Sequence, residues 1–266
     1  MFSSAVAAAA VAVAIGAAAS SSGASSSNPG LMSAGTLEVG MNLQFKPEMY
    51  LNGSQPAGYD VDLLKILAAK LGVKLKIDNL AFTGLIPGLQ AKKFDMVSVG
   101  LTDTPAREQV VSFSKPYVPY AQVVAVPAKD KSIKTVAALN KSGKTITALL
   151  GSTAQMEAQK LFPNAKVEAL ADQNSDFALV ATGRADGIVV EDYLLAQFQK
   201  ANPGKLIKVP TPPLDVQYGS YAVQKGNTKL STYLNSFLCT SSKNGTLARL
   251  YKKDFGTKSF PGVPAC

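Results

Sequence analysis

The 266-residue chain contains no histidine and no tryptophan, and it has only two cysteines. Histidine is the commonest general acid and base near neutral pH and a frequent metal ligand. Without histidine, two cysteines are too few ligands for a zinc site of the usual kind. We therefore predict no metal, no cofactor and no catalytic residue.

Charge is absent from the first 37 residues. Residues 5–19 form an Ala- and Val-rich run that is too short and too weakly apolar for a membrane span. The run is typical of the central part of a secretory signal, with residues 17–19 as a candidate cleavage site, although the usual basic start is missing. Residues 20–30 are typical of a flexible Ser/Gly tether. We therefore expect an exported protein, periplasmic or at the cell surface.

The formal net charge is +9, which raises the question of a nucleic-acid partner. The lysines are scattered, however, and no basic stripe interleaved with aromatic residues is present. We therefore predict a solvated basic surface and no nucleic-acid interface.

The two cysteines are Cys239 and Cys266. An even number of cysteines in an exported chain favours one disulfide, which would fix the C-terminal tail to a late helix. The alternative is two unrelated thiols, with Cys239 buried and Cys266 at a frayed end.

Hydrophobic periodicity predicts strands and helices in alternation. The first unit has strands at 36–41, 73–77 and 94–101 and helices at 60–71 and 85–92, with Asp60 as the first N-cap and Gly72 ending that helix. This βαβαβ order predicts an α/β fold with a mostly parallel sheet. The remaining predicted elements are strands at 122–127, 144–150, 167–170, 187–190 and 218–223, and helices at 154–161, 176–182 and 230–252.

Three motifs stand out: GYDVDLLKILAAKL at 58–71, GLTDTPAR at 100–107 and FSKPY at 113–117. Together they resemble the polar amino-acid-binding family of bacterial extracytoplasmic solute-binding proteins, which are the capture subunits of ABC importers. The resemblance implies a periplasmic-binding-protein-like fold of type II, with two α/β lobes joined by a two-strand hinge. The implied segments are 1–35 outside the fold, 36–119 with 220–266 as lobe 1, and 120–219 as lobe 2.

Arg107 follows a predicted strand, and its guanidinium can match a planar carboxylate with two parallel hydrogen bonds. In the resembled family this arginine clamps the α-carboxylate of the ligand, with Gly100 and Thr102 contacting the carboxylate and amino group. Thr153 lies at a strand-to-helix turn and would add its backbone N–H. The alternatives are a surface ion pair between Arg107 and Glu108 and an ordinary helix cap near Thr153.

Residues 183–191 resemble the family stretch that ends in an acid for the ligand ammonium, usually aspartate. The matching residue here is Glu191, and Asp192 is the alternative; both could instead be solvent-facing acids. Phe45 and Phe82 match positions whose rings sandwich the ligand side chain, although each could equally be core.

Asn42 matches a position where binders of basic amino acids often carry aspartate. The neutral amide therefore favours a polar, uncharged ligand side chain, while the nearby Glu48 could reverse that inference.

The resemblance implies a monomeric receptor that closes two lobes over one amino acid and then docks on a membrane permease. Its chemistry would be recognition without catalysis. One alternative is an enzyme of the cyclohexadienyl dehydratase type, with Glu191 or Asp192 as general acid. Another is the ligand-sensing domain of a receptor.

Overall fold

The computed structural model describes residues 1–2, 29–264 and 266. The predicted signal-like run at 5–19 and most of the predicted tether at 20–30 lie outside these residues. Among the described helices, none has the length and apolar character needed to cross a membrane.

Within the described residues, one sheet of nine strands runs through the molecule in the order β5-β1-β6-β12-β7-β10-β8-β9, with β11 paired to β7. At one end β1 pairs in parallel with β5 and β6, and at the other end β8 pairs in parallel with β9 and β10. Between these groups, β7 and β12 are antiparallel to each other. The strands of this sheet are β1 (Thr36–Met41), β5 (Lys74–Asn79), β6 (Met96–Thr102), β7 (Val111–Pro127), β8 (Thr145–Leu149), β9 (Lys166–Leu170), β10 (Gly187–Glu191), β11 (Leu206–Lys208) and β12 (Asp215–Gln224).

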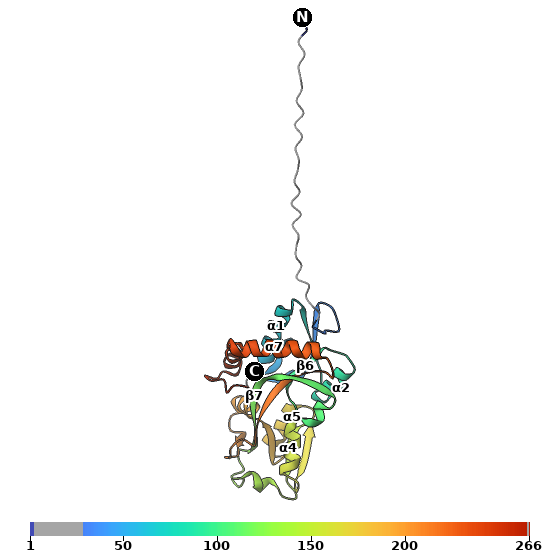
Figure 1. Ribbon diagram of the computed structural model, residues 1–266. Helices are drawn as coiled ribbons and strands as arrows, with labels where there is room; N and C mark the ends of the chain where they lie inside the picture. Colours follow the sequence, from blue (N-terminus) through green and yellow to red (C-terminus); the bar gives the residue numbers. More distant parts are fainter. Residues whose placement is uncertain (3–28, 265) are drawn as a thin grey trace.

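Helices cover both parallel groups, which makes two α/β lobes (Figure 1). The helices α1, α2, α7 and α8 belong to the lobe built on β1, β5 and β6, whereas α4, α5 and α6 pack on the strands β8, β9 and β10. This arrangement confirms the predicted type II fold of two lobes joined by two strands; the predicted lobe boundaries stay a prediction. The helices are α1 (Tyr59–Leu71), α2 (Leu85–Gln90), α3 (Pro105–Glu108), α4 (Thr153–Leu161), α5 (Gln173–Ala181), α6 (Asp192–Ala201), α7 (Thr228–Lys243) and α8 (Thr246–Phe255), with short 3₁₀ turns η1 (Phe82–Gly84) and η2 (Val136–Leu139).

A small second sheet lies beside the first lobe and carries part of the site described below. It pairs its three strands in antiparallel order, β2 (Gln44–Phe45), β3 (Met49–Asn52) and β4 (Gln55–Ala57). The start of α1 holds the turn between β2 and β3, because Tyr59 N donates to Pro47 O and Asp60 N donates to Glu48 O.

The first helix ends as predicted but begins differently. Gly72 takes a left-handed conformation, φ 67°, and its N–H reaches the carbonyls of the last turn. The predicted N-cap at Asp60 is wrong, because Gly58 occupies the cap position and no side chain caps the helix. Asp60 is instead fully buried, and its carboxylate accepts hydrogen bonds from Ser98 Oγ and Tyr117 OH. Tertiary burial here outweighs the local preference of aspartate for a helix start.

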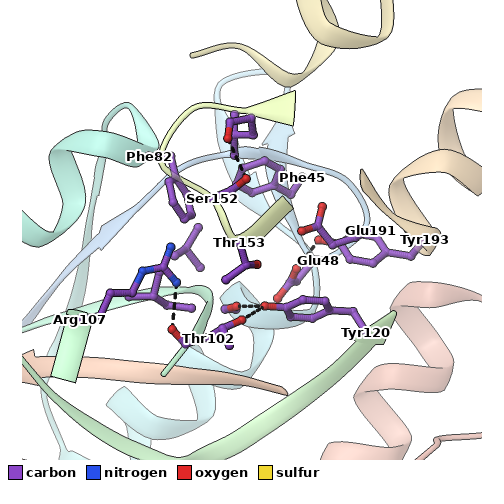
Figure 2. Close-up of a pocket in the computed structure, with 14 residues that line it drawn as sticks. Phe45, Glu48, Phe82, Thr102, Arg107, Tyr120, Ser152, Thr153, Glu191 and Tyr193 are labelled. Carbon is purple, nitrogen blue, oxygen red and sulfur yellow. Dashed lines mark hydrogen bonds between the residues drawn. The ribbon is translucent and has the colours of Figure 1, made fainter. Parts of the chain in front are cut away.

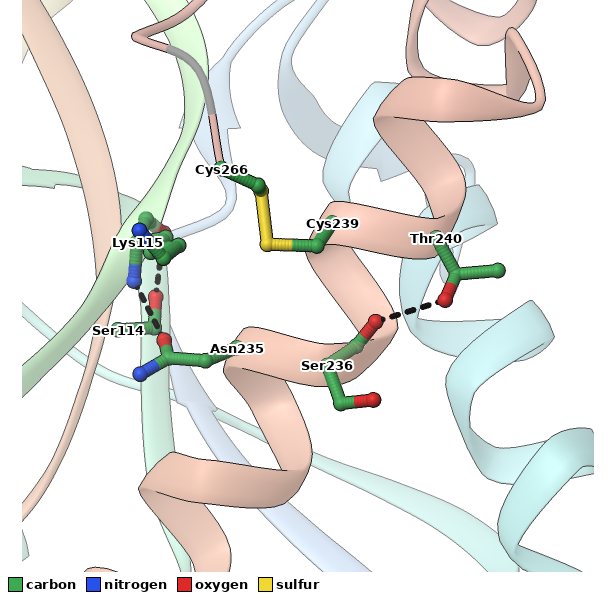
Figure 3. Close-up of a disulfide and its surroundings, with 7 residues drawn as sticks. All are labelled: Ser114, Lys115, Asn235, Ser236, Cys239, Thr240 and Cys266. Atoms are coloured by element: carbon green, nitrogen blue, oxygen red, sulfur yellow. Dashed lines mark hydrogen bonds between the residues drawn. A yellow bond between two sulfur atoms is a disulfide. The ribbon is translucent and has the colours of Figure 1, made fainter.

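The disulfide between Cys239 and Cys266 is present, as predicted, with Cα atoms 5.5 Å apart. It joins the C-terminal tail to α7 (Figure 3). The same helix is tied to β7, because Lys115 N donates to Asn235 Oδ1. In the chain-entropy model a bridge closing a loop of this size stabilises a fold by about 3 kcal/mol.

Candidate functional site

A small cavity lies where the two lobes face each other. Its walls come from the carboxyl ends of strands in both lobes, from the β2–β3 turn and from the first residues of α4 and α6. The lining residues are Phe45, Glu48, Phe82, Val99, Gly100, Leu101, Thr102, Arg107, Tyr120, Leu149, Ser152, Thr153, Glu191 and Tyr193 (Figure 2). Every predicted site residue except Asn42 is among them.

Arg107 forms one end of the cavity. Thr104 caps the short helix α3 and accepts from Arg107 N, which fixes the backbone just after β6. The guanidinium Nη1 donates to Thr102 O at 2.9 Å, and Nη2 donates to Gly151 O in the other lobe at 3.0 Å. Burial lowers the pKa of Arg107 below its ordinary value, and an arginine remains charged in a protein. The predicted alternative of a surface ion pair with Glu108 is not present.

A hydrogen-bond network of hydroxyls and amides forms the floor between the lobes. Tyr120 OH donates to Gly100 O at 2.9 Å and also lies within hydrogen-bond distance of Thr102 Oγ1. Gln217 Oε1 accepts from Thr102 Oγ1 at 3.0 Å and from Thr153 Oγ1 at 2.8 Å. Because Gln217 lies on β12, one of the two joining strands, this network connects both lobes to the hinge.

The turn before α4 has the predicted helix-start geometry. Ser152 is the N-cap and its side chain accepts from Gln155 N. Thr153 is the first residue of α4 and lines the cavity. A ligand oxygen at this point would meet backbone N–H groups and the positive end of the helix dipole.

Phe45 and Phe82 lie side by side above this floor. Their ring centroids are 6.5 Å apart and the ring planes are at 81°, so the rings meet edge to face. The Phe82 ring also lies under the Arg107 guanidinium, 5.7 Å from the ring centroid. The two rings form one apolar wall and are not parallel to each other.

Glu191 and Glu48 form the end opposite Arg107 (Figure 2). Glu191 is the last residue of β10, and burial raises the pKa of its carboxyl. Asp192 does not line the cavity; its Oδ1 accepts from Tyr193 N at 2.8 Å at the start of α6. The structure therefore brings Glu191, and not Asp192, to the site.

Asn42 lies outside the lining. Its Nδ2 donates to Leu80 O at 2.8 Å, and its Oδ1 accepts from Gln44 Nε2. Both ends of the amide are thus occupied within the first lobe.

Sequence reasoning did not place Tyr120 or Tyr193 in the cavity, and it raised Glu48 only as a nearby acid that could reverse the inference from Asn42. Tyr193 OH donates to Glu48 Oε2 across 145 positions of sequence. No local pattern signals such a contact.

Two α/β lobes on a two-strand hinge, with a polar cavity between them, define a binding protein of the type II class. The family of bacterial extracellular solute-binding proteins, family 3, matches residues 37–257. The chain belongs to this family, and the family's description implies export from the cytoplasm.

The chain is 31% identical to the arginine-binding extracellular protein ArtP of Bacillus subtilis, over 82% of this chain and 86% of that protein. Among solved structures, it resembles an ancestral arginine-binding protein bound to arginine, with a TM-score of 0.78 and 33% identity, over 84% and 99% of the two chains. It also resembles an ancestral amino acid-binding protein that is a precursor of cyclohexadienyl dehydratase, with a TM-score of 0.76 and 34% identity, over 83% and 95%.

Proposed function

We propose that this protein is an extracytoplasmic receptor that binds one free amino acid in the cavity and delivers it to an ABC importer in the membrane. The observation that carries the proposal is the polarity of the cavity. The guanidinium of Arg107 lies at one end of the cavity. The carboxyl groups of Glu48 and Glu191 lie at the other end. This pattern is complementary to the zwitterion of an amino acid.

In this proposal Arg107 binds the α-carboxylate, supported by Thr102 and by the N–H groups at Thr153. Glu191 and the carbonyl of Gly100 accept from the α-ammonium. The guanidinium would exchange its present acceptor, Gly151 O, for a ligand oxygen. That exchange is favourable because a carboxylate adds an opposite full charge and can accept two parallel hydrogen bonds from the guanidinium fork.

Phe45 and Phe82 would contact the side chain of the ligand. The predicted preference for a polar, uncharged side chain rested on Asn42. Its amide is already engaged by Leu80 O and Gln44, so the structure offers that preference no support and it stays a prediction.

Closure of the lobes supplies the switch by which ligand binding is signalled to the permease. Contacts across the cleft support a closed form: Arg107 Nη2 reaches Gly151 O, Tyr193 OH reaches Glu48, and Gln173 N donates to Gln44 Oε1 at 2.8 Å. A ligand that bridges the same elements stabilises this form by its differential affinity for it.

The alternative is a dehydratase-type enzyme on the same scaffold. Burial raises the pKa of both Glu48 and Glu191, and a carboxyl that keeps its proton can act as a general acid. One of the similar structures is a precursor of such an enzyme and is itself an amino acid-binding protein. The proposed receptor needs no protonated acid, so prephenate turnover separates the two functions.

The test is thermal melting against the twenty amino acids, ornithine, cystine and prephenate. A ligand at a hundred times its dissociation constant adds about 2.7 kcal/mol to the unfolding free energy, which raises the melting temperature by several degrees. We expect a shift with at least one amino acid that Arg107→Ala abolishes.

Arg184→Ala is the matched control, because Arg184 is exposed and does not line the cavity. It should leave the shift unchanged. Absence of any shift with amino acids would overturn the receptor, and turnover of prephenate would establish the enzyme in its place.

A further inference from the structure

Glu48 is held in the cavity wall by the start of α1. Its carbonyl accepts from Asp60 N at 3.0 Å. Gly58, at φ 111°, packs so closely that a Cβ there would lie 2.6 Å from the same carbonyl. On the cavity side, a Cβ on Gly100 would lie 2.4 Å from Glu48 Oε1. Gly58 therefore makes room for the backbone of Glu48 and Gly100 makes room for its carboxylate, and the residue is only 2% exposed.

The carboxylate of Glu48 is half satisfied. Oε2 accepts from Tyr193 OH, whereas Oε1 is buried and has no hydrogen-bond partner. Leaving a buried acceptor unpaired is costly, and more so for a charged one. Unlike an ordinary core polar group, Glu48 also lines the cavity, so a bound molecule can reach it.

No basic side chain of the described chain compensates this carboxylate. The groups that act on the pKa of Glu48 are Asp60, Tyr193 and Glu191, and burial together with the two acids raises it. The described residues also contain no cluster of acids, cysteines or histidines arranged to hold a metal ion. Without a cation the buried carboxyl favours its protonated form, and a positive group of a bound ligand beside it would favour the carboxylate instead.

The charges that line the cavity do not balance for an ordinary zwitterion. The ionisable side chains of opposite charge that line the cavity are one base, Arg107, and two acids, Glu48 and Glu191. A zwitterion offers one carboxylate for Arg107 and one ammonium for Glu191, which leaves Glu48 without a partner. A ligand with a second positive group satisfies all three.

We propose that Glu48 determines the charge class of the ligand and selects amino acids whose side chain ends in a guanidinium or an ammonium. This inference rests on the proposed receptor function and extends it. A neutral hydrogen-bond donor would fill the vacant acceptor position but leave the carboxylate charge uncompensated, so it binds less tightly.

Titration calorimetry on the intact protein tests the inference with two matched ligand pairs. L-Arginine and L-citrulline have nearly the same shape, but only arginine carries a positive side chain. L-Lysine and L-norleucine have the same carbon chain, but only lysine carries a terminal ammonium. We expect the cationic member of at least one pair to bind roughly tenfold to a hundredfold more tightly, the range typical of a hydrogen bond to a buried charge. Glu48→Gln should reduce that ratio to within about threefold, because the amide cannot compensate a cation.

Glu108→Gln is the control, since it removes the same charge from an exposed residue outside the cavity. It should keep the ratio of the wild type. A melting curve of Glu48→Gln, and its binding of the neutral pair member, would show that the variant folds.

Three results would contradict the inference. If the wild type binds the neutral members as tightly as the cationic ones, or if Glu48→Gln keeps the preference, Glu48 does not select charge, and the receptor function stands. If no amino acid of the melting panel binds, the receptor function itself fails and the inference fails with it.

Discussion

The two ends of the cavity differ in how the protein meets their charge. At one end both Arg107 donors reach backbone carbonyls, one in each lobe. At the other end Glu48 and Glu191 meet no basic side chain of the described chain, and one Glu48 oxygen has no partner. A neutral carbonyl is readily exchanged for a ligand carboxylate, whereas a buried carboxylate gains most from a cation. We infer that the guanidinium end binds the α-carboxylate that every amino acid has, whereas the carboxylate end selects ligands by the charge of their side chain.

Replacement of Arg107 by lysine sharpens this comparison and has the largest expected effect. Lysine keeps the charge but loses the fork that matches a carboxylate with two hydrogen bonds. We expect Arg107→Lys to weaken every amino-acid ligand by roughly a hundredfold, whatever its side chain. Calorimetry with a cationic and a neutral ligand measures this, and Arg184→Lys at the surface is the control. A loss of affinity confined to cationic ligands would show that Arg107 does not bind the carboxylate common to all amino acids.

The end of the first helix and two of the site residues could be predicted from short stretches of sequence, either from local chemistry or from a family motif. The helix Tyr59–Leu71 ends at Gly72 because only a residue without a Cβ accepts that left-handed turn at no cost. Arg107 was singled out because the motif at 100–107 resembles that of the family, and in the structure Thr104 and Pro105 begin a short helix directly after β6. Glu191 was singled out because residues 183–191 resemble the family stretch that ends in an acid, and in the structure it ends the buried strand β10 at the cleft.

What the sequence could not predict depends on contacts between distant segments. Asp60 is in the core because Ser98 and Tyr117 satisfy its carboxylate, which overrides its use as a cap. Asn42 is turned away from the cavity by a bond to Leu80 O. Glu48 is a buried cavity acid because the start of α1 holds its backbone and Tyr193, on a helix of the opposite lobe, donates to its carboxylate.

Asp176 allows a comparison between a cavity acid and a buried acid elsewhere. It lies in α5, fully buried, away from the cavity lining, and burial raises its pKa from 3.8 to about 8. The folded state thus keeps a proton that the unfolded chain loses, so this contribution to stability is complete below pH 3.8 and is lost as the pH rises to about 8.

We expect Asp176→Asn to change how the unfolding free energy depends on pH and to leave ligand affinity unchanged. Between about pH 5 and pH 8 the unfolding free energy of the wild type should fall by up to about 4 kcal/mol relative to Asp176→Asn, since the slope is at most about 1.4 kcal/mol per pH unit over these three units. Urea unfolding followed by circular dichroism measures the difference. Ligand affinity should be the same in both proteins at pH 7. Parallel pH profiles for the two proteins would show that Asp176 does not titrate in this range.

Tyr193→Phe has the smallest expected effect and tests whether the carboxylate end is oriented from the opposite lobe. Phenylalanine keeps the ring, which packs edge to face on Phe255 at 5.3 Å, and removes only the donor to Glu48. Without that hydrogen bond the Glu48 carboxylate is harder to ionise, so the preference for a cationic over a neutral ligand should fall by roughly fivefold, the value of one ordinary hydrogen bond. Calorimetry with arginine and citrulline measures the ratio, and Tyr233→Phe, away from the cavity, should not change it. A rise in the ratio would mean that Tyr193 competes with the ligand for Glu48 instead of holding it in place.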